Sequence, residues 1–214
     1  MAEFPLVVSP LRLLLNGEPF IRNFRWKPEL ELRFRVVEKD TGREVAKAAS
    51  EAAFAFHHVN AYEQDQELVL DLVAYPDPGV IDQLYLSRLR AGAPVDAAGF
   101  LWRYFIPLGG GGSIRLQQLS QTPLELPRID YAQTAGRPHR IVLGSSNKEP
   151  GNFLDNLVCQ PGNVGNGARQ AVIPVSRCLW RRQTSGMRAK AYCCRWSSTR
   201  ATATRFCSRW TPHR

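Results

Sequence analysis

The sequence predicts an all-β fold, and three observations lead to that prediction. Short segments rich in β-branched and aromatic residues recur along the first 157 residues. Clusters of Gly, Pro, Asp and Asn separate these segments, as expected of turns. A single brief stretch has the spacing of an amphipathic helix. The pattern is typical of a β-sandwich, a barrel or a propeller, and by itself it does not choose among the three.

The first clear strand covers residues 30–36. Apolar and charged side chains alternate through it (LELRFRV), which is the period of a strand with one buried face. The sequence Asp40, Thr41, Gly42 then favours a hairpin turn. We therefore expect an antiparallel partner strand to begin near Arg43.

A second strand is expected over residues 67–75. Its sequence, ELVLDLVAY, is a nearly continuous run of β-forming apolar residues, which is typical of a strand covered on both faces. The sequence PDPG at 76–79 ends it. Residues 80–85 have the spacing of one face of a short helix, which Gly92 would end.

Three more strands complete the expected set, at residues 100–108, 125–131 and 139–143. A run of four glycines at 109–112 precedes the second of them. It is expected to be a flexible loop tip, because the Lys-Ser/Thr and the helix start that a phosphate-binding loop needs do not follow it.

The distribution of charge divides the chain near Leu157. The formal net charge of the 214 residues is +9. The first 157 residues carry 17 basic and 19 acidic side chains, and the last 57 carry 11 basic side chains and no carboxylate. All five cysteines lie in this second part as well. We therefore expect a β-domain over 1–157 and a disordered basic tail over 158–214.

The tail leaves a second class of function open. Its Trp–Arg pairs could support RNA binding through stacking and phosphate contacts. A small basic β-protein that binds nucleic acid or an anionic membrane through its tail is therefore an alternative hypothesis. The chain has no apolar run of membrane-spanning length and no secretory signal at its start, so a cytoplasmic location is expected.

Candidate metal ligands are limited to four histidines, His57, His58, His139 and His213. Neighbouring side chains on a strand point to opposite faces, so His57 and His58 cannot both bind one ion. Because iron and zinc sites take three or four protein ligands, a single imidazole is by itself better explained by a hydrogen-bonded core histidine. The sequence predicts no catalytic nucleophile or paired carboxylates.

The sequence around His57 resembles the carotenoid cleavage oxygenase family. The resemblance is carried by FHHVNAYE at 56–63 and LVLDLVAY at 68–75, and it continues over nearly all of residues 10–157. Supporting segments are FIR at 20–22, FRV at 34–36, LYL at 84–86, RY at 103–104, IPL at 106–108 and ELPRIDY at 125–131. Among the branches of the family, the one that cleaves β-carotene centrally is the most similar in sequence at VNAYE and VAY. The eccentric-cleavage and retinoid isomerohydrolase branches are alternatives.

The resemblance implies a seven-bladed β-propeller with a non-haem Fe(II) on its axis, held by four histidines. Family members use the iron and O₂ to cleave a polyene double bond of a carotenoid, or split a retinyl ester in the isomerohydrolase branch. His57 matches the family's third iron ligand, and its second ring nitrogen should be oriented by a carboxylate. Asn60 and Glu63 are expected to shape the end of the strand. Aromatic side chains expected to line a polyene tunnel are Phe54, Phe56, Tyr62, Trp102, Tyr104 and Phe105.

The chain also departs from the family. The other three iron ligands have no counterpart, because two fall before Met1 and His213 lacks the surroundings of the fourth. We therefore expect an incomplete arc of blades that neither binds iron tightly nor turns over substrate. Such an arc leaves two strand edges unpaired, which favours aggregation.

A shifted reading frame explains the tail. If the DNA is read one nucleotide late after about residue 158, permitted codons turn Val172–Trp180 into Cys-Tyr-Pro-Ser-Glu-Pro-Val-Phe-Val, the family's next motif. Residues 191–200 and 206–212 give further family-like segments in the right order. On this hypothesis the basic tail has no nucleic-acid partner. No defined protein partner is expected, whereas peripheral membrane contact stays open.

Overall fold

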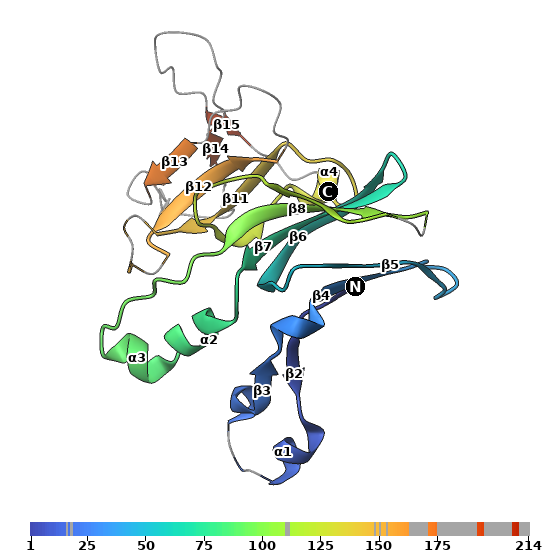
Figure 1. The fold of residues 1–214 in the computed structure, drawn as a ribbon. Helices are drawn as coiled ribbons and strands as arrows, with labels where there is room; N and C mark the ends of the chain where they lie inside the picture. The colour runs from blue at the N-terminus through green and yellow to red at the C-terminus, as the bar shows by residue number, and fades with distance from the viewer. Residues whose placement is uncertain are drawn as a thin grey trace, which may run out of the picture. The chain divides into compact units, whose positions relative to one another are not determined.

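The computed structural model describes residues 1–15, 17, 19–109, 112–147, 149, 151–152, 154–162, 171–174, 192–194 and 207–209. Strands dominate these residues (Figure 1). The prediction of an all-β chain is therefore confirmed for the part described. The chain divides into two compact units, Met1–Cys178 and Leu179–Arg214.

The first sheet has the strand order β1-β4-β5, formed by β1 (Ala2–Glu3), β4 (Leu32–Val37) and β5 (Glu44–Ser50). Along β4, Leu32 and Phe34 are buried, whereas the two arginines between and after them are exposed. The alternation predicted from the sequence is thus confirmed. The hairpin predicted at 40–42 joins β4 to β5, and Gly42 has the positive φ of 72° that favours glycine.

A separate two-stranded ribbon pairs β2 (Leu6–Val8) with β3 (Phe24–Trp26). The helix α1 (Pro10–Leu15) and the 3₁₀ turn η1 (Phe20–Asn23) connect the two strands, and η2 (Pro28–Leu30) leads on to β4. The ribbon extends away from the three larger sheets (Figure 1). Strands of three residues are too short to show a period, so the sequence did not predict them.

The second sheet has the order β6-β7-β8-β9 and is antiparallel throughout. Its strands are β6 (Phe54–Gln64), β7 (Glu67–Tyr75), β8 (Phe100–Pro107) and β9 (Arg115–Gln118). The bounds of β7 are those predicted, and Val69–Tyr75 are all buried. The single helix expected over 80–85 is instead two short helices, α2 (Gly79–Gln83) and α3 (Leu86–Arg90).

The third sheet has the order β10-β11-β12-β13. Its strands are β10 (Glu125–Arg128), β11 (Ile141–Ser146), β12 (Asn156–Pro161) and β13 (Ala171–Pro174). The strand expected over 125–131 ends early, because Asp130 accepts the backbone bonds that begin α4 (Tyr131–Thr134). The strand expected at 139–143 begins two residues later.

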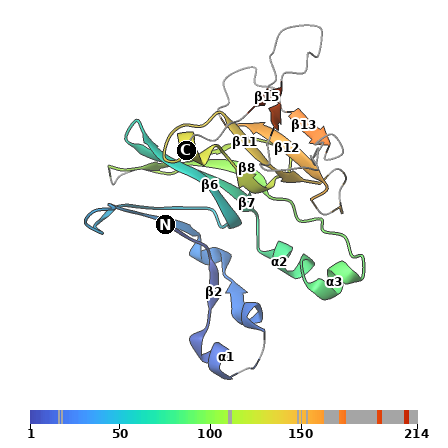
Figure 2. The ribbon, with the colours of Figure 1, turned by 180° about the vertical axis from the view of Figure 1, so that it is seen from behind.

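The three sheets stack face to face, with the second in the middle (Figures 1 and 2). Leu32, Phe34, Leu72 and Ile106 belong to the core between the first and second sheets. A second core between the second and third sheets contains Val59, Val73, Leu101, Leu119, Leu124, Val142 and Val158. The middle sheet is therefore covered on both faces, which explains the apolar sequence of β7. An arc of propeller blades fits this stacking, and the number of blades stays a prediction.

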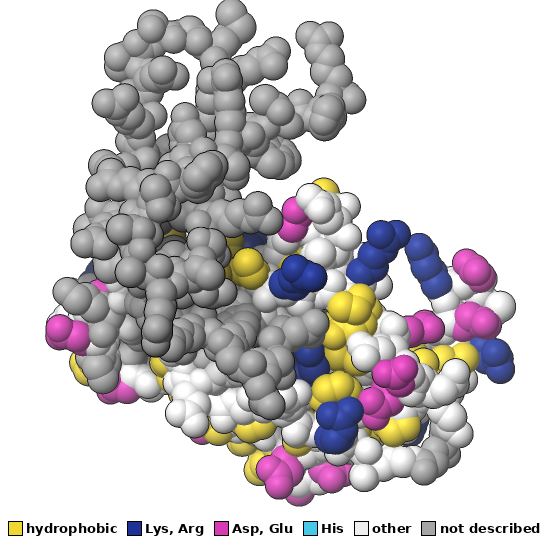
Figure 3. All heavy atoms as spheres, turned by 90° about the horizontal axis from the view of Figure 1, so that it is seen from above, with side chains coloured by type: hydrophobic (Ala, Val, Ile, Leu, Met, Phe, Trp, Pro, Cys, Tyr) yellow, Lys and Arg dark blue, Asp and Glu magenta, His cyan; other side chains and the backbone are white. Residues whose placement is uncertain are grey.

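The expected division at Leu157 falls inside β12, and the buried Val158 follows it. In the second unit, β14 (Tyr192–Cys194) pairs antiparallel with β15 (Cys207–Arg209). Tail residues 158–161, 171–174, 192–194 and 207–209 form strands, so the disorder expected of the whole tail does not hold for them. His213 and most of the remaining tail lie outside the described part, and for those residues disorder stays a prediction. Acidic and basic side chains intermingle on the described surface visible in Figure 3. Among the residues that the structure describes, no helix combines the length and the apolar sequence that crossing a membrane requires.

Candidate metal and polyene site

His57 lies on β6 between two irregularities of the strand. The register with β7 skips Phe56 and Val59, so His57 pairs with Val73 and Asn60 with Asp71. Bulges of this kind change the direction in which the neighbouring side chains point. His57 points to the third sheet, where its Nδ1 lies 2.7 Å from Oε2 of Glu125, the first residue of β10. The two side chains are 41% and 12% exposed, respectively.

The Glu125 carboxylate receives two more hydrogen bonds. The hydroxyl of Tyr75 donates to Oε1 at 2.7 Å, and the backbone N–H of Leu126 donates to Oε2 at 2.9 Å. Burial raises the pKa of Tyr75 well above its ordinary value, and the nearby Glu125 carboxylate adds to the rise. Tyr75 therefore stays protonated and donates its hydrogen bond. The carboxylate of Glu125 is thus bound both by Tyr75 of the second sheet and by Leu126 of the third.

This arrangement fixes the tautomer of His57. A carboxylate that already accepts two hydrogen bonds acts as an acceptor, so Nδ1 of His57 carries the proton. Nε2 then presents a lone pair. An imidazole whose far nitrogen donates to a carboxylate is the usual form of a metal-ligating histidine. The donor set thus fits one ligand position of an Fe(II) or similar divalent ion.

His57 also lines an apolar cavity of about 370 Å³. Tyr75 and Glu125 line it as well, and most of its remaining wall is hydrophobic. The apolar wall includes Phe56, Val80, Leu84, Val95, Leu124 and Leu154. A hydrophobic pocket with a few convergent polar groups is the usual form of a small-molecule site.

Of the six aromatic residues expected to line a tunnel, only Phe56 lies in this wall. Phe54 packs behind it, with ring centroids 4.9 Å apart. The other four point elsewhere, because they occupy different faces of the middle sheet. Tyr104 belongs to the core with the first sheet, and Tyr62 lies beside His139. Trp102 packs against the same core as Tyr104, and Phe105 stacks under the guanidinium of Arg115.

The other two described histidines, His58 and His139, do not join His57. His58 turns to the opposite side and meets the ring of Phe4, which agrees with strand alternation. His139 is buried at 1% exposure near Asp71, in a structural environment. The described residues contain no group of three or more His, Cys, Asp or Glu side chains that could hold an ion. They therefore supply one ligand and its orienting carboxylate.

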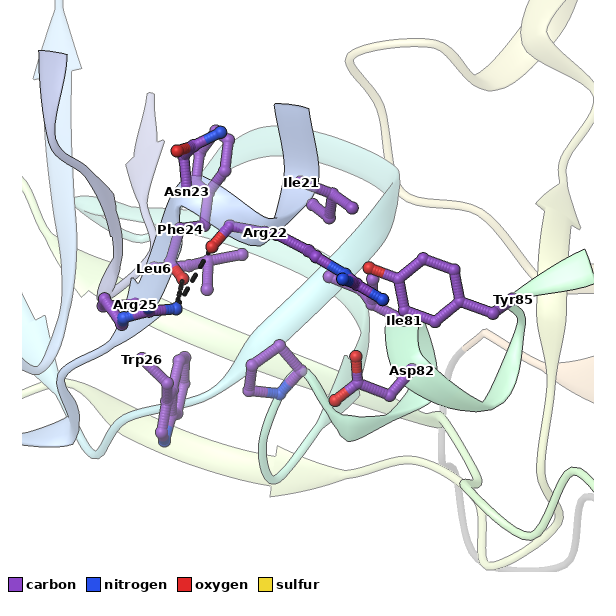
Figure 4. Close-up of a pocket in the computed structure, with 11 residues that line it drawn as sticks. Leu6, Ile21, Arg22, Asn23, Phe24, Arg25, Trp26, Ile81, Asp82 and Tyr85 are labelled. Atoms are coloured by element: carbon purple, nitrogen blue, oxygen red, sulfur yellow. Dashed lines mark hydrogen bonds between the residues drawn. The ribbon is translucent and has the colours of Figure 1, made fainter. Parts of the chain in front are cut away.

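A second cavity, of about 630 Å³, lies between the β2–β3 ribbon and α2 (Figure 4). Arg22 extends over the ring of Tyr85, 5.9 Å from its centroid. Arg25 donates from Nη1 to the backbone carbonyls of Arg22 and Phe24. This cavity has no imidazole, so it differs chemically from the cavity at His57.

Sequence reasoning missed Glu125 and Tyr75. Both were inside segments that carry the family resemblance, at the start of ELPRIDY and at the end of LVLDLVAY. Neither segment shows by its own pattern that its polar residue meets His57. Asn60 was expected to shape the end of its strand and the hydrogen bonding there. β6 instead continues to Gln64, and the side chain of Asn60 binds the backbone of residues 134–137.

Comparisons with known proteins were consistent with one another. The family model described as "RPE65: Retinal pigment epithelial membrane protein" matches residues 2–177. Carotenoid isomerooxygenase of Galleria mellonella is 33% identical over 156 residues, which cover 68% of this chain and 30% of that protein. Beta,beta-carotene 15,15'-dioxygenase of Gallus gallus is 36% identical over 77 residues, covering 33% of this chain and 15% of that protein.

Solved structures show the same fold. Cobalt-substituted Synechocystis ACO has a TM-score of 0.68 at 20% identity, over 81% of this chain and 35% of that one. An ACO/RPE65 chimera gives a TM-score of 0.67 over the same shares. The chain thus spans about a third of the length of the proteins that it matches.

Proposed function

The chain belongs to the RPE65 and carotenoid oxygenase family, and from that premise we propose that it is part of an oxygenase that cleaves a polyene. The observation that carries this proposal is the contact of His57 Nδ1 with Glu125 Oε2, 2.7 Å long, in the wall of an apolar cavity. The similar proteins are named as oxygenases that act on carotenoids or apocarotenoids, which supports the same reaction class for this chain.

His57 would hold the family's Fe(II) through Nε2. When bound, the iron supplies the activation of O₂ for oxidative cleavage of a double bond. Glu125 keeps the proton of His57 at Nδ1, and Tyr75 keeps the carboxylate in place. The apolar wall excludes water and contacts the hydrocarbon part of the substrate.

The substrate would be a carotenoid or a retinoid, because the wall offers hydrophobic contact with few polar partners. We propose central cleavage of β-carotene to retinal, which the 36% identity to the Gallus gallus enzyme supports over 77 residues. Eccentric cleavage and retinyl-ester hydrolysis with isomerisation are the alternatives within the family. A cytoplasmic location stays a prediction from the sequence.

The experiment is a titration of the full chain with all-trans-retinol, followed by retinoid fluorescence. We expect saturable binding that Phe56→Asp weakens, because Phe56 lines the cavity. Since Phe56 is half-exposed, we expect the variant to fold, and circular dichroism checks that it does. The matched control is Leu116→Asp, which is similarly exposed on β9 and outside the cavity. Equal loss of binding in both variants contradicts the proposed site.

A second proposal concerns α1. Four apolar side chains near the tip of the β2–β3 ribbon are largely exposed to solvent, and these are Leu11, Leu14, Leu15 and Phe20. Leu14 and Leu15 are 82% and 72% exposed. Contiguous exposed apolar residues mark contact surfaces. We propose that this patch makes the peripheral membrane contact that the sequence left open.

For the tail, we propose the out-of-frame origin described above. Its support is the change in charge, cysteine and tryptophan content after Leu157. The family match runs on to residue 177 and the compact first unit to Cys178, beyond the proposed shift at about residue 158, so neither boundary supports that position of the shift. Sequencing the coding DNA tests the proposal, and a second frame that lacks the family's next motifs contradicts it.

A further inference from the structure

Three alternate side chains of β7 point to the third sheet. Residues two apart on a strand share a face, so Asp71, Val73 and Tyr75 point the same way. Tyr75 reaches Glu125, and Val73 belongs to the apolar core between the two sheets. Asp71 is fully buried. Along β7, the apolar contact of Val73 with the third sheet is therefore flanked by two polar side chains, Asp71 and Tyr75.

Asp71 forms a bidentate ion pair with Arg103 of β8. Nε of Arg103 lies 2.8 Å from Oδ1, and Nη2 lies 2.8 Å from Oδ2. The side chains are 0% and 6% exposed. Nη2 of Arg103 also donates to the backbone carbonyl of Gly162, at 2.6 Å, just past the end of β12. One guanidinium thus ties the second sheet to the third.

His139 and Asn60 extend the same connection. His139, two residues before β11, has its Nδ1 3.2 Å from Nδ2 of Asn60, and its Nε2 lies 3.3 Å from Oδ2 of Asp71 without a hydrogen bond. Asn60 donates to the carbonyls of Thr134 and Arg137 at 3.0 and 2.8 Å. A Cβ atom at Gly162 would lie 2.6 Å from the His139 ring, so only glycine allows this close packing.

We propose that Asp71 and Arg103 are positioning residues for the hydrogen bond between His57 and Glu125. That bond joins the same two sheets, three residues along β6 from Asn60. Aliphatic side chains in the intervening core attract without direction, so they permit small shifts of one sheet over the other. A bidentate pair that also binds Gly162 has a fixed geometry and resists such shifts. A hydrogen bond weakens steeply when its partners move or tilt.

The inference rests on the site of the proposed function, but it concerns a contact that the chain makes without a metal. The test is ¹⁵N NMR of the His57 ring in the full chain. The wild type is expected to show the tautomer with the proton on Nδ1, with that proton protected from exchange. A wild-type proton on Nε2 would instead contradict the proposed function.

The variant is Asp71→Leu/Arg103→Met, because two apolar residues of similar size can replace a buried ion pair without leaving one charge unpaired. We expect it to fold and to exchange the Nδ1 proton at least about tenfold faster, with a mixture of tautomers. Unchanged exchange and tautomer in the folded variant overturn the positioning role and leave the proposed function intact.

The matched control is Glu67→Gln/Arg115→Met. Glu67 and Arg115 form an ion pair at 3.1 Å within the second sheet and do not connect it to the third. The control should behave as the wild type, and an equal effect there overturns the inference. If the apolar variant fails to fold, Arg103→Lys serves instead. Its single ammonium cannot keep the geometry of three hydrogen bonds, and an unchanged His57 signal in it also overturns the inference.

Discussion

The hydroxyl of Tyr75 and the carboxylate of Glu125 are hydrogen bonded at 2.7 Å, although the residues belong to different sheets and lie 50 positions apart. Through the second carboxylate oxygen, Glu125 holds His57. Two side chains from the middle sheet therefore meet on one residue of the third. The geometry of the imidazole depends on how these sheets are packed.

Removal of the Tyr75 hydroxyl tests the stabilising part of this contact. Tyr75→Phe leaves one carboxylate oxygen of Glu125 without its donor, so we expect the free energy of unfolding to fall by about 1.5–3 kcal/mol. Urea denaturation measures the change. The control is Tyr131→Phe, a partly exposed tyrosine of α4, which should change stability little. Equal effects of the two substitutions contradict the role of Tyr75.

Acid is expected to destabilise the fold through His139. Burial lowers its pKa below 6.5, and Arg103 acts in the same direction, while Asp71 opposes them. The unfolded chain therefore binds the proton first. Stability is complete above about pH 6.5 and falls as pH drops from there towards the folded-state pKa. The groups facing His139 are Asp71 of β7, Arg103 of β8 and Tyr62 of β6.

Urea denaturation at a series of pH values measures this effect. The contribution of His139 has a slope of at most about 1.4 kcal/mol per pH unit. Burial lowers the pKa of His58 too, so His58 adds to the trend. His139→Gln should flatten the profile between pH 6.5 and the acid limit of folding, relative to the wild type. An unchanged slope in that variant shows that His139 is not responsible.

Iron binding by the chain is expected to be weak. The described residues place one oriented imidazole at the site and contain no cluster of three ligands. Anaerobic calorimetry with Fe(II) should show no saturating binding, because mononuclear sites need three or four protein ligands. Stoichiometric binding that His57→Ala abolishes and His58→Ala leaves unchanged would show a complete site and refute this prediction.

Membrane contact through α1 is tested with phosphatidylcholine vesicles at high salt. Leu14→Glu/Leu15→Glu should reduce flotation with vesicles by about tenfold or more, because two exposed leucines lose their apolar contact. Ile141→Glu, on β11, is the control for adding charge at an exposed apolar residue. Binding that requires anionic lipid and disappears at high salt would point to the basic tail instead.

Local patterns accounted for much of the fold. The alternation in β4 and the continuous apolar run of β7 predicted both strands, because side-chain burial follows the period of the backbone. Strand alternation also predicted that His57 and His58 face apart, although β6 has two irregularities of register. The end of β10 was misplaced, since the turn into α4 depends on backbone hydrogen bonds to Asp130.

The sequence by itself determined the β-class of the chain, the family resemblance and His57 as the candidate ligand. Tertiary structure alone decided which carboxylate orients that histidine, because Glu125 follows it by 68 positions and reaches it only when two sheets stack. The same stacking decided that Asp71 and Arg103 lie buried beside Gly162. A local pattern encodes which face of a strand is apolar, whereas the pairing of polar groups across that face depends on the register between sheets.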